Sequence, residues 1–396
     1  MKVMEQWQTM QIKEIYNGLY DGPHATPKPA EEGPIFLGIK NVTDDGQLDL
    51  NTIRHIAEAE FGRWTKRVEP RAGDIVFTYE ATLNRYAIIP EGFRGCLGRR
   101  MALIRPDPEK IDTRFLHFYF FSKSWRDVIS NNILTGATVD RIPLTTFPDF
   151  PITIPSLPTQ RRIAGILSAY DDLIENNLRR IRILEEMAQS LYREWFAHFR
   201  IPSEVLQKAG LPPEITLVDS PLGPIPDGWE VKRVEDALKR FPAGKKYSQK
   251  TVDETGSIPV LDQGKSGIIG YHNKEPGFVA TEDDPVIVFA NHTCYQRIIQ
   301  YPFSAIQNVL PFRSAPDLER NLYWLHWATK DVIEFNDYKG HWPEFIAKQL
   351  LIPPAEICGE FGKRAEATVR ETYCLERKNQ TLRQTRDLLL PKLLGS

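Results

Sequence analysis

The chain repeats itself, and this repeat restricts its possible folds more than any other feature of the sequence. Ile154-Pro155 recurs as Ile352-Pro353, an offset of 198 residues (352 minus 154) and half of the 396-residue length. Each of the two pairs precedes a long helical pattern. Self-similarity of this kind is typical of chains built from similar structural units. The sequence therefore predicts two halves with the same fold.

Further matches follow the same order in both halves, with small changes of spacing between them. They include aromatic segments, β-rich runs and single glycines and tryptophans. The matched positions are Trp7 with Trp229, Gly73-Asp74-Ile75-Val76-Phe77 with Pro285-Val286-Ile287-Val288-Phe289, Phe115-Leu116-His117-Phe118 with Trp324-Leu325-His326-Trp327, Arg126-Asp127-Val128-Ile129 with Lys330-Asp331-Val332-Ile333, and Gly136 with Gly340. No single match is convincing, and their shared order carries the argument.

Each half has a mixed front part and a helical back part. Short β-rich runs, such as 74–79 and 286–290, are separated by Gly, Pro and Asn turns. We therefore predict an α+β fold, with two similar mixed α/β domains and two long helices. The predicted ranges are 1–150 for the first mixed domain, 151–200 for the first helix, 201–224 for a Pro-rich connector, 225–347 for the second mixed domain and 348–396 for the second helix.

The first predicted helix runs from Thr159, a candidate N-cap residue after Pro158, to Phe199. Its apolar residues repeat every seven positions. One set of positions is Leu167, Ile174, Ile181, Ala188 and Trp195, and the other is Tyr170, Asn177, Leu184 and Leu191. A seam sustained over more than four heptads is typical of a coiled coil.

The second predicted helix runs from about Phe361 to Leu394 and has a more polar seam. Its seam positions are Ala365, Thr372, Asn379, Arg386 and Leu393, with Thr368, Leu375, Leu382 and Leu389. A helix this long cannot bury an apolar seam alone, so we expect the two helices to pair. Two alternatives stay open, namely ordinary bundle helices of one compact domain and pairing between two copies of the chain.

The composition excludes several classes of protein. Hydrophobic residues make up 41% of the chain, yet no apolar run approaches the ~20 residues of a membrane span. The first residues lack the apolar segment of a signal peptide. Four scattered cysteines form no disulfide framework, which fits a reducing cytoplasm. A net charge of −2 argues against a simple nucleic-acid binder, so DNA binding would need local basic patches or a partner.

Three segments carry more specific motifs. The first segment, 152–196, contains the run Ile154-Pro155-Ser156-Leu157-Pro158-Thr159-Gln160-Arg161-Arg162-Ile163 at the start of the first helix. The second segment is Leu222-Gly223-Pro224-Ile225-Pro226-Asp227-Gly228-Trp229. The third is the tail Arg386-Asp387-Leu388-Leu389-Leu390-Pro391-Lys392-Leu393-Leu394. Together with the repeat, these motifs make the whole chain resemble the specificity subunit of type I restriction–modification systems.

The resemblance implies a DNA-recognition subunit that has no catalytic activity of its own. Each of two target-recognition domains would read one half of a bipartite DNA site, and the two helices, packed antiparallel, would set the gap between the halves. Two methyltransferase subunits would bind the helices, and restriction subunits with translocase and nuclease activity could join them. The chain itself would bind no cofactor, whereas S-adenosylmethionine, ATP and Mg²⁺ would bind to the partner subunits.

The residues alone give no clear sign of catalysis. Gly264-Lys265-Ser266 resembles the end of a phosphate-binding loop, but Pro259 stands where the first glycine is needed. We find no G-x-G-x-x-G motif for a methyl donor and no set of residues with the spacing of zinc ligands. The matched His117 and His326 lie among aromatic residues, and we interpret them as packing or capping residues.

DNA-reading residues are expected in polar and basic loops, because Arg and Lys suit guanine whereas Asn and Gln suit adenine. The candidates in the first half are Lys40, Asn41, Tyr79, Arg85, Arg99, Arg100, Thr135, Gly136, Thr138 and Arg141. The candidates in the second half are Lys245, Lys246, Tyr247, Gln263, Lys265, Ser266, Asn291, His292, Lys339, Gly340 and His341. The matched Gly136 and Gly340 loops rank first.

Two other functions compete with DNA recognition. A coiled-coil scaffold that binds other proteins does not need glycine loops with basic neighbours. Charge reversal of Arg141 and Lys339 that left DNA binding intact would favour this scaffold. An enzyme with an unrecognised nuclease or transferase site would show activity as the purified chain, given a metal ion or a methyl donor.

Overall fold

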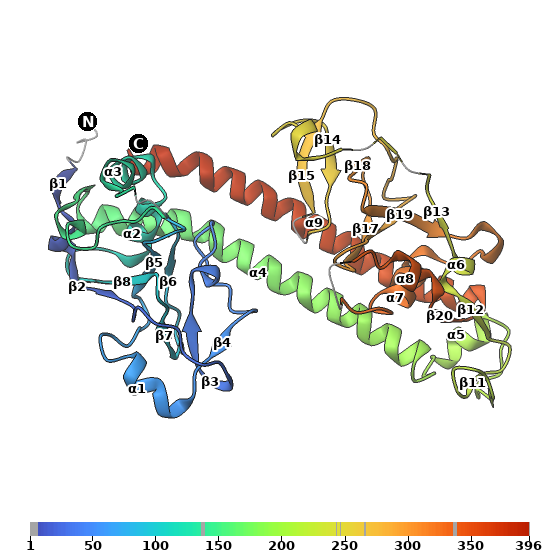
Figure 1. The fold of residues 1–396 in the computed structure, drawn as a ribbon. Helices are drawn as coiled ribbons and strands as arrows, with labels where there is room; N and C mark the ends of the chain where they lie inside the picture. Colours follow the sequence, from blue (N-terminus) through green and yellow to red (C-terminus); the bar gives the residue numbers. More distant parts are fainter. Residues whose placement is uncertain are drawn as a thin grey trace. The chain divides into compact units, whose positions relative to one another are not determined.

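The chain folds into two compact units. The computed structural model describes residues 7–135, 139–242, 244–245, 247–264, 267–335 and 339–395. Unit 1 is formed by 1–176 together with 379–396, and unit 2 is formed by 177–378 (Figure 1). Among the described residues, no helix is both long enough and apolar enough to cross a membrane.

Unit 1 is built around a four-stranded antiparallel sheet, with strand order β2-β8-β5-β6, and a three-stranded sheet, β4-β3-β7, in which β3 and β7 are parallel. Its elements are β1 (Gln8–Gln11), η1 (Ile12–Ile15), β2 (Tyr16–Asp21), β3 (Ala30–Leu37), η2 (Ile39–Asn41), β4 (Arg54–His55), η3 (Glu58–Glu60), α1 (Phe61–Trp64), β5 (Ile75–Thr78), β6 (Tyr86–Ile88), β7 (Gly95–Leu97), β8 (Met101–Pro106), α2 (Thr113–Phe120), α3 (Lys123–Asn132), η4 (Phe147–Asp149) and β9 (Pro151–Ile154).

Unit 2 has the same two sheets, in the orders β13-β19-β16-β17 and β15-β14-β18, with β14 and β18 parallel. Its elements are α5 (Ser203–Lys208), β10 (Leu217–Val218), β11 (Ile225–Pro226), β12 (Glu230–Arg233), α6 (Val234–Ala237), β13 (Leu238–Arg240), η5 (Gln249–Thr251), β14 (Ile258–Leu261), β15 (Ile268–His272), β16 (Val286–Ala290), β17 (Gln296–Ile299), β18 (Ser304–Ala305), β19 (Val309–Ser314), η6 (Pro316–Leu318), α7 (Leu322–Thr329), α8 (Trp342–Ala347) and β20 (Gln349–Ile352).

The predicted repeat is confirmed strand by strand. The Ile-Pro motif ends an outer strand in both units: Ile154 of β9 pairs with Gln8 of β1, and Ile352 of β20 pairs with Glu230 of β12. The aromatic segments form α2 and α7, which begin after capping residues at matched positions. Asp112 accepts a hydrogen bond from the backbone N–H of Phe115, and Asn321 accepts one from Tyr323, each at 2.9 Å.

One sequence match needs correction. Residues 126–129 lie in α3, whereas their supposed match at 330–333 is not helical, so the two segments share sequence but not conformation. The Pro-rich connector predicted at 201–224 is partly helical. It contains α5, whose Val205 and Leu206 are buried in the core of unit 2, because apolar residues four and three positions before Ala209 form one helix face.

The two long helices are α4 (Leu157–Phe196) and α9 (Ala355–Leu394), and both begin earlier than predicted. Thr159 is not the N-cap of α4, because Pro158 is accommodated in the first helical turn, where its missing N–H has no intrahelical partner to lose. α9 begins six residues before Phe361, and its first turn buries Ile357 and Cys358 in the core. Helix formation there is stabilised by packing as well as by local sequence.

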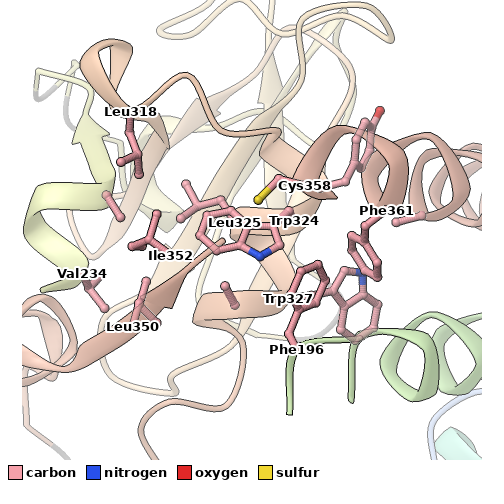
Figure 2. Packing of buried hydrophobic residues seen from close by; sticks show 14 of the residues in the cluster. Phe196, Val234, Leu318, Trp324, Leu325, Trp327, Leu350, Ile352, Cys358 and Phe361 are labelled. Atoms are coloured by element: carbon pink, nitrogen blue, oxygen red, sulfur yellow. The ribbon is translucent and has the colours of Figure 1, made fainter. Parts of the chain in front are cut away.

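Within unit 2, the helix segments run antiparallel and pack through aromatic side chains. Arg180 of α4 pairs with Glu371 of α9 (Nη2 to Oε1, 2.7 Å), while Phe361, earlier on α9, contacts Trp195 and Phe196, later on α4. Figure 2 shows Phe361 and Phe196 together with Trp324 and Trp327 of α7 in this cluster of buried hydrophobic residues. The predicted pairing of the helices is therefore confirmed inside this unit.

Within unit 1, the first half of α4 and the last turns of α9 complete the core of the mixed domain. Leu167 is fully buried in the same cluster as Leu394. The polar seam position Arg386 faces Asp171 of α4, with Nη1 2.5 Å from Oδ1. This ion pair explains how an arginine is accommodated on the seam, because the carboxylate compensates the charge as water is removed.

Candidate nucleic-acid interface

Three separate segments of unit 1 meet at one end of its four-stranded sheet. The residue that follows β5, Tyr79, donates its backbone N–H to the carbonyl of Arg100 (3.3 Å), which lies in the turn before β8. Its own carbonyl accepts from the N–H of Ile142 (2.8 Å), which lies in the segment between α3 and η4. Most of the candidates in the first half are thereby brought together, although they are spread over 60 residues of sequence.

The arginines at this junction differ in how far their charge is compensated. Arg85 pairs with Asp44 (Nε to Oδ1, 2.6 Å), and Arg100 pairs with Glu80 (Nε to Oε1, 3.2 Å). Arg99 is exposed and makes no ion pair within the described part of the chain. Of the three, Arg99 is therefore best able to bind a phosphate or a base edge.

Leu134 and Arg141 lie next to the junction and are joined by two backbone hydrogen bonds, from Leu134 N to Arg141 O (2.9 Å) and from Arg141 N to Leu134 O (3.1 Å). Thr135 and Arg141 are exposed, and Arg141 has no ion pair among the residues that are described. Gly136 and Thr138, both predicted to contact DNA, lie outside the described residues.

Two candidates of unit 1 serve the fold instead. Asn41 is buried: its Oδ1 accepts from Gly38 N (2.9 Å) and its Nδ2 donates to Asp49 O (3.0 Å), so the amide closes its own loop. Tyr79 is buried in the aromatic core, and burial raises the pKa of its hydroxyl. Both residues were predicted from their type alone, and we leave them out of the interface. The neighbouring Lys40 is exposed on η2.

Unit 2 builds the same junction from different residues. The residue that follows β16, Asn291, donates its N–H to Asn308 O (2.9 Å) and accepts at its carbonyl from His341 N (2.9 Å). Its Oδ1 also accepts from the N–H of Trp342 (2.8 Å). A Cβ atom on residue 340 would lie 3.0 Å from Asn291 Nδ2, so Gly340 permits this close approach.

The hydrogen bonds also correct one predicted match. Since Ile142 and His341 bond to corresponding carbonyls, the residue of unit 1 that corresponds to Gly340 is Arg141 rather than Gly136. His341 itself is fully buried and was predicted as a DNA contact only because of its neighbours. Lys339 and Gly340 are both exposed.

Two of the remaining candidates of unit 2, Tyr247 and Gln263, line an open groove of about 450 Å³. Gln263 joins two of its walls, because its Oε1 accepts from His292 N (2.8 Å) and its carbonyl accepts from Thr293 Oγ1 (2.7 Å). Tyr247 is buried and stacks on His272, with ring centroids 4.7 Å apart. Lys245 is exposed next to that ring. Lys246, Lys265 and Ser266 fall outside the residues that the structure describes.

The groove also contains polar residues that the sequence did not single out. They share amide or hydroxyl side chains and are Ser248, Gln249, Thr293, Gln307 and Asn308. Gln307 and Asn308 form a two-residue turn before β19, at the place where Arg99 and Arg100 precede β8. Aligning the two halves through the strands on each side of these turns would have revealed them.

The matched histidines are buried within the two cores. His117 Nε2 lies 3.1 Å from Gly46 O, and His326 Nδ1 lies 3.1 Å from Gln296 Nε2. Burial lowers the pKa of His117 to about 4 and that of His326 to about 3. Neither histidine has a carboxylate partner in these contacts, which fits a packing role. Within the described residues, no group of three or more His, Cys, Asp or Glu side chains is placed to hold a metal ion.

Known proteins resemble this chain over nearly its whole length. Residues 4–186 match the family model described as the type I restriction modification DNA specificity domain. The chain is 24% identical to the MjaIX specificity subunit of Methanocaldococcus jannaschii, over 97% of this chain and 88% of the relative. It is 23% identical to the HindI specificity subunit of Haemophilus influenzae, over 82% of this chain and 86% of the relative.

A solved structure supports the fold. The crystal structure of the type I restriction–modification S subunit from M. genitalium aligns with 99% of this chain and 97% of its own, with a TM-score of 0.57 and 15% identity. The predicted α+β architecture is confirmed by this likeness. Residues 4–186 thus match a type I restriction modification DNA specificity domain, and over nearly its whole length the chain is similar to specificity subunits of type I restriction enzymes.

Proposed function

We propose that each unit reads one half of a two-part DNA site through the loop junction at the end of its four-stranded sheet. The observation that carries this proposal is the duplication of the junction. The N–H of Tyr79 bonds to Arg100 O, and the N–H of Asn291 bonds to Asn308 O. The backbone hydrogen bonds of the junction are the same in both units, whereas its exposed side chains differ. This is what we expect of two domains that read different DNA sequences.

The distribution of charge agrees with this proposal despite the net charge of −2. Exposed cations without an ion pair among the described residues stand at or beside each junction. They are Lys40, Arg99 and Arg141 in unit 1, and Lys245 and Lys339 in unit 2. Phosphate contacts by a few such side chains give weak, salt-dependent binding. We therefore expect strong DNA binding only once methyltransferase subunits contribute their own surface.

The test is to co-express the full chain with a type I methyltransferase subunit and map methylated adenines by single-molecule sequencing. The expected result is two short defined blocks around a fixed undefined gap, and exchange of residues 1–150 with those of another subunit changes one block only. The double variant Arg141→Glu and Lys339→Glu should bind DNA at least about tenfold more weakly in the complex. The control Lys110→Glu lies at the opposite end of β8 and should bind normally. A stable complex without any methylated motif would favour the protein scaffold.

We also propose that the outer face of α4 binds the methyltransferase subunits. Unit 1 leaves Ile166 and Leu173 exposed, seven residues apart, and unit 2 leaves Ile183 and Met187 exposed, four apart. These spacings place each pair on one helix face. Exposed apolar residues on a helix face are typical of protein interaction sites. S-adenosylmethionine, ATP and Mg²⁺ would then act on the partner subunits.

Glutamate at Leu173 and Met187 is expected to weaken assembly with the methyltransferase subunit by at least about tenfold, because each would bury a charge in an apolar interface. Pull-down with the tagged methyltransferase, followed by titration calorimetry, measures the loss. Leu222→Glu is the matched control, since Leu222 is also about half exposed (47%) but lies off the helices. Full assembly by the double variant would show that the partner binds elsewhere.

A further inference from the structure

One β-turn is conserved in geometry between the two units but not in chemistry. In unit 1, the backbone N–H of Met101 donates to Gly98 O (3.2 Å), which closes a turn around Arg99 and Arg100. In unit 2, the N–H of Val309 donates to Ile306 O (3.1 Å), around Gln307 and Asn308. The first turn leads directly into β8, which lies between β2 and β5, and the second leads into β19, which lies between β13 and β16.

The surrounding hydrogen bonds fix the correspondence residue by residue. The first residue of each turn donates its N–H to the last residue of a neighbouring strand. Gly98 N donates to Leu37 O of β3 (2.6 Å), and Ile306 N donates to Leu261 O of β14 (3.0 Å). β3 is parallel to β7, and β14 is parallel to β18. The second central residue of each turn, Arg100 or Asn308, accepts at its carbonyl the hydrogen bond from Tyr79 N or Asn291 N. Arg99 therefore corresponds to Gln307, and Arg100 to Asn308.

Exposure follows the same correspondence. Arg99 and Gln307 are exposed, whereas Arg100 and Asn308 are half-buried. Arg100 is further restrained by Glu80, with Nε 3.2 Å from Oε1. In each turn, the first central residue is thus the one that can extend from the protein to a bound duplex.

The two side chains suit different bases. A guanidinium presents two parallel donors, which match the O6 and N7 acceptors of guanine, whereas an amide presents one donor and one acceptor, which match N7 and N6 of adenine. The surroundings point the same way. The groove beside Gln307 is lined by further amides, Gln249 and Gln263, and by no Lys or Arg among its described residues.

We propose that Arg99 reads a guanine in the half-site of unit 1 and that Gln307 reads an adenine at the corresponding position of the half-site of unit 2. The inference rests on the proposed function, because it assigns bases to the two halves of the site. The two half-sites of one target therefore differ in base at one structurally equivalent position, and the difference follows from a single exchange in a repeated turn.

The test uses the full chain assembled with its methyltransferase subunit, and double-stranded DNA carrying the mapped motif or single-base changes in it. Arg99→Gln should reduce discrimination for one guanine of the unit 1 block by roughly 10- to 100-fold and leave the other block unchanged. Gln307→Arg should do the same for one adenine of the unit 2 block. Exchange of residues 1–150 identifies which block belongs to which unit.

Two further variants separate base reading from other roles. Arg99→Lys keeps the charge but loses the planar pair of donors, so it should weaken discrimination while keeping the salt dependence of binding. Arg99→Ala and Gln307→Ala repeat the measurement with small side chains, and assembly of each variant is checked by gel filtration. A defined bipartite motif in which all these changes leave both blocks intact overturns the inference alone. A wild-type complex that methylates no defined motif overturns the inference together with the proposed function.

Discussion

Replacing Phe361 with alanine is expected to lower the free energy of unfolding of unit 2 by about 3–5 kcal/mol. Phe361 is fully buried on α9, with ring centroids 5.2 Å from Phe196 and 6.0 Å from Trp195 of α4. Truncation leaves a cavity between the two helices and removes these aromatic contacts. Since domains are stable by only about 5–15 kcal/mol, the loss is a large share of the total.

Hydrogen exchange across a urea series would measure the effect, because it follows the two units separately. The matched control is Phe335→Ala, also in unit 2, since Phe335 is 55% exposed and should contribute less than about 1 kcal/mol. Unit 1 should keep its own protection in both variants. Equal losses for the two phenylalanines would mean that the packing of α9 against α4 does not stabilise unit 2.

Acidification is expected to destabilise both units through their buried histidines. Burial favours the neutral imidazole, which lowers the pKa of His117 to about 4 and that of His326 to about 3 from the ordinary value of 6.5. Below pH 6.5 both imidazoles are therefore protonated in the unfolded chain, whereas they stay neutral in the folded chain until their lower pKa is reached. Stability is present above pH 6.5 and falls as the pH approaches 4, by on the order of 3 kcal/mol for each histidine.

The variants His117→Gln and His326→Gln should flatten this pH dependence in the unit that carries them, even if they lower stability at pH 7. Urea denaturation between pH 7 and pH 4 gives the slope for each variant. Replacing the exposed His198 by glutamine provides the matched control. A slope that persists in both core variants would assign the acid sensitivity to carboxylates instead.

The sequence predicted the parts of the fold that depend on buried, repeated residues. The Ile-Pro strand ends and the aromatic helices α2 and α7 recur because both units bury the same faces. The helix starts were placed too late, because Pro158 fits a first turn and because the start of α9 is stabilised by the core around Cys358. Local patterns carry no information on such tertiary packing.

The candidate interface was harder to predict than the fold. Arg99 and Arg141 were predicted because basic residues beside turns are visible in the sequence, and their contacts with DNA stay predictions. Asn41 and Tyr79 were included by residue type, although one supports a loop and the other a core. Gln307 was not singled out, because its turn is recognised only when the two halves are aligned through the flanking strands, where it takes the place of Arg99.

The composition of unit 1 has a consequence for biosynthesis. Unit 2 is a continuous stretch of chain and can fold as soon as it leaves the ribosome, whereas the core of unit 1 includes Leu394, on the final turn of α9. The segment 379–394 is translated about 200 residues after residue 176, a delay of roughly 10–40 s at 5–20 residues per second. The half that is translated first is thus completed last.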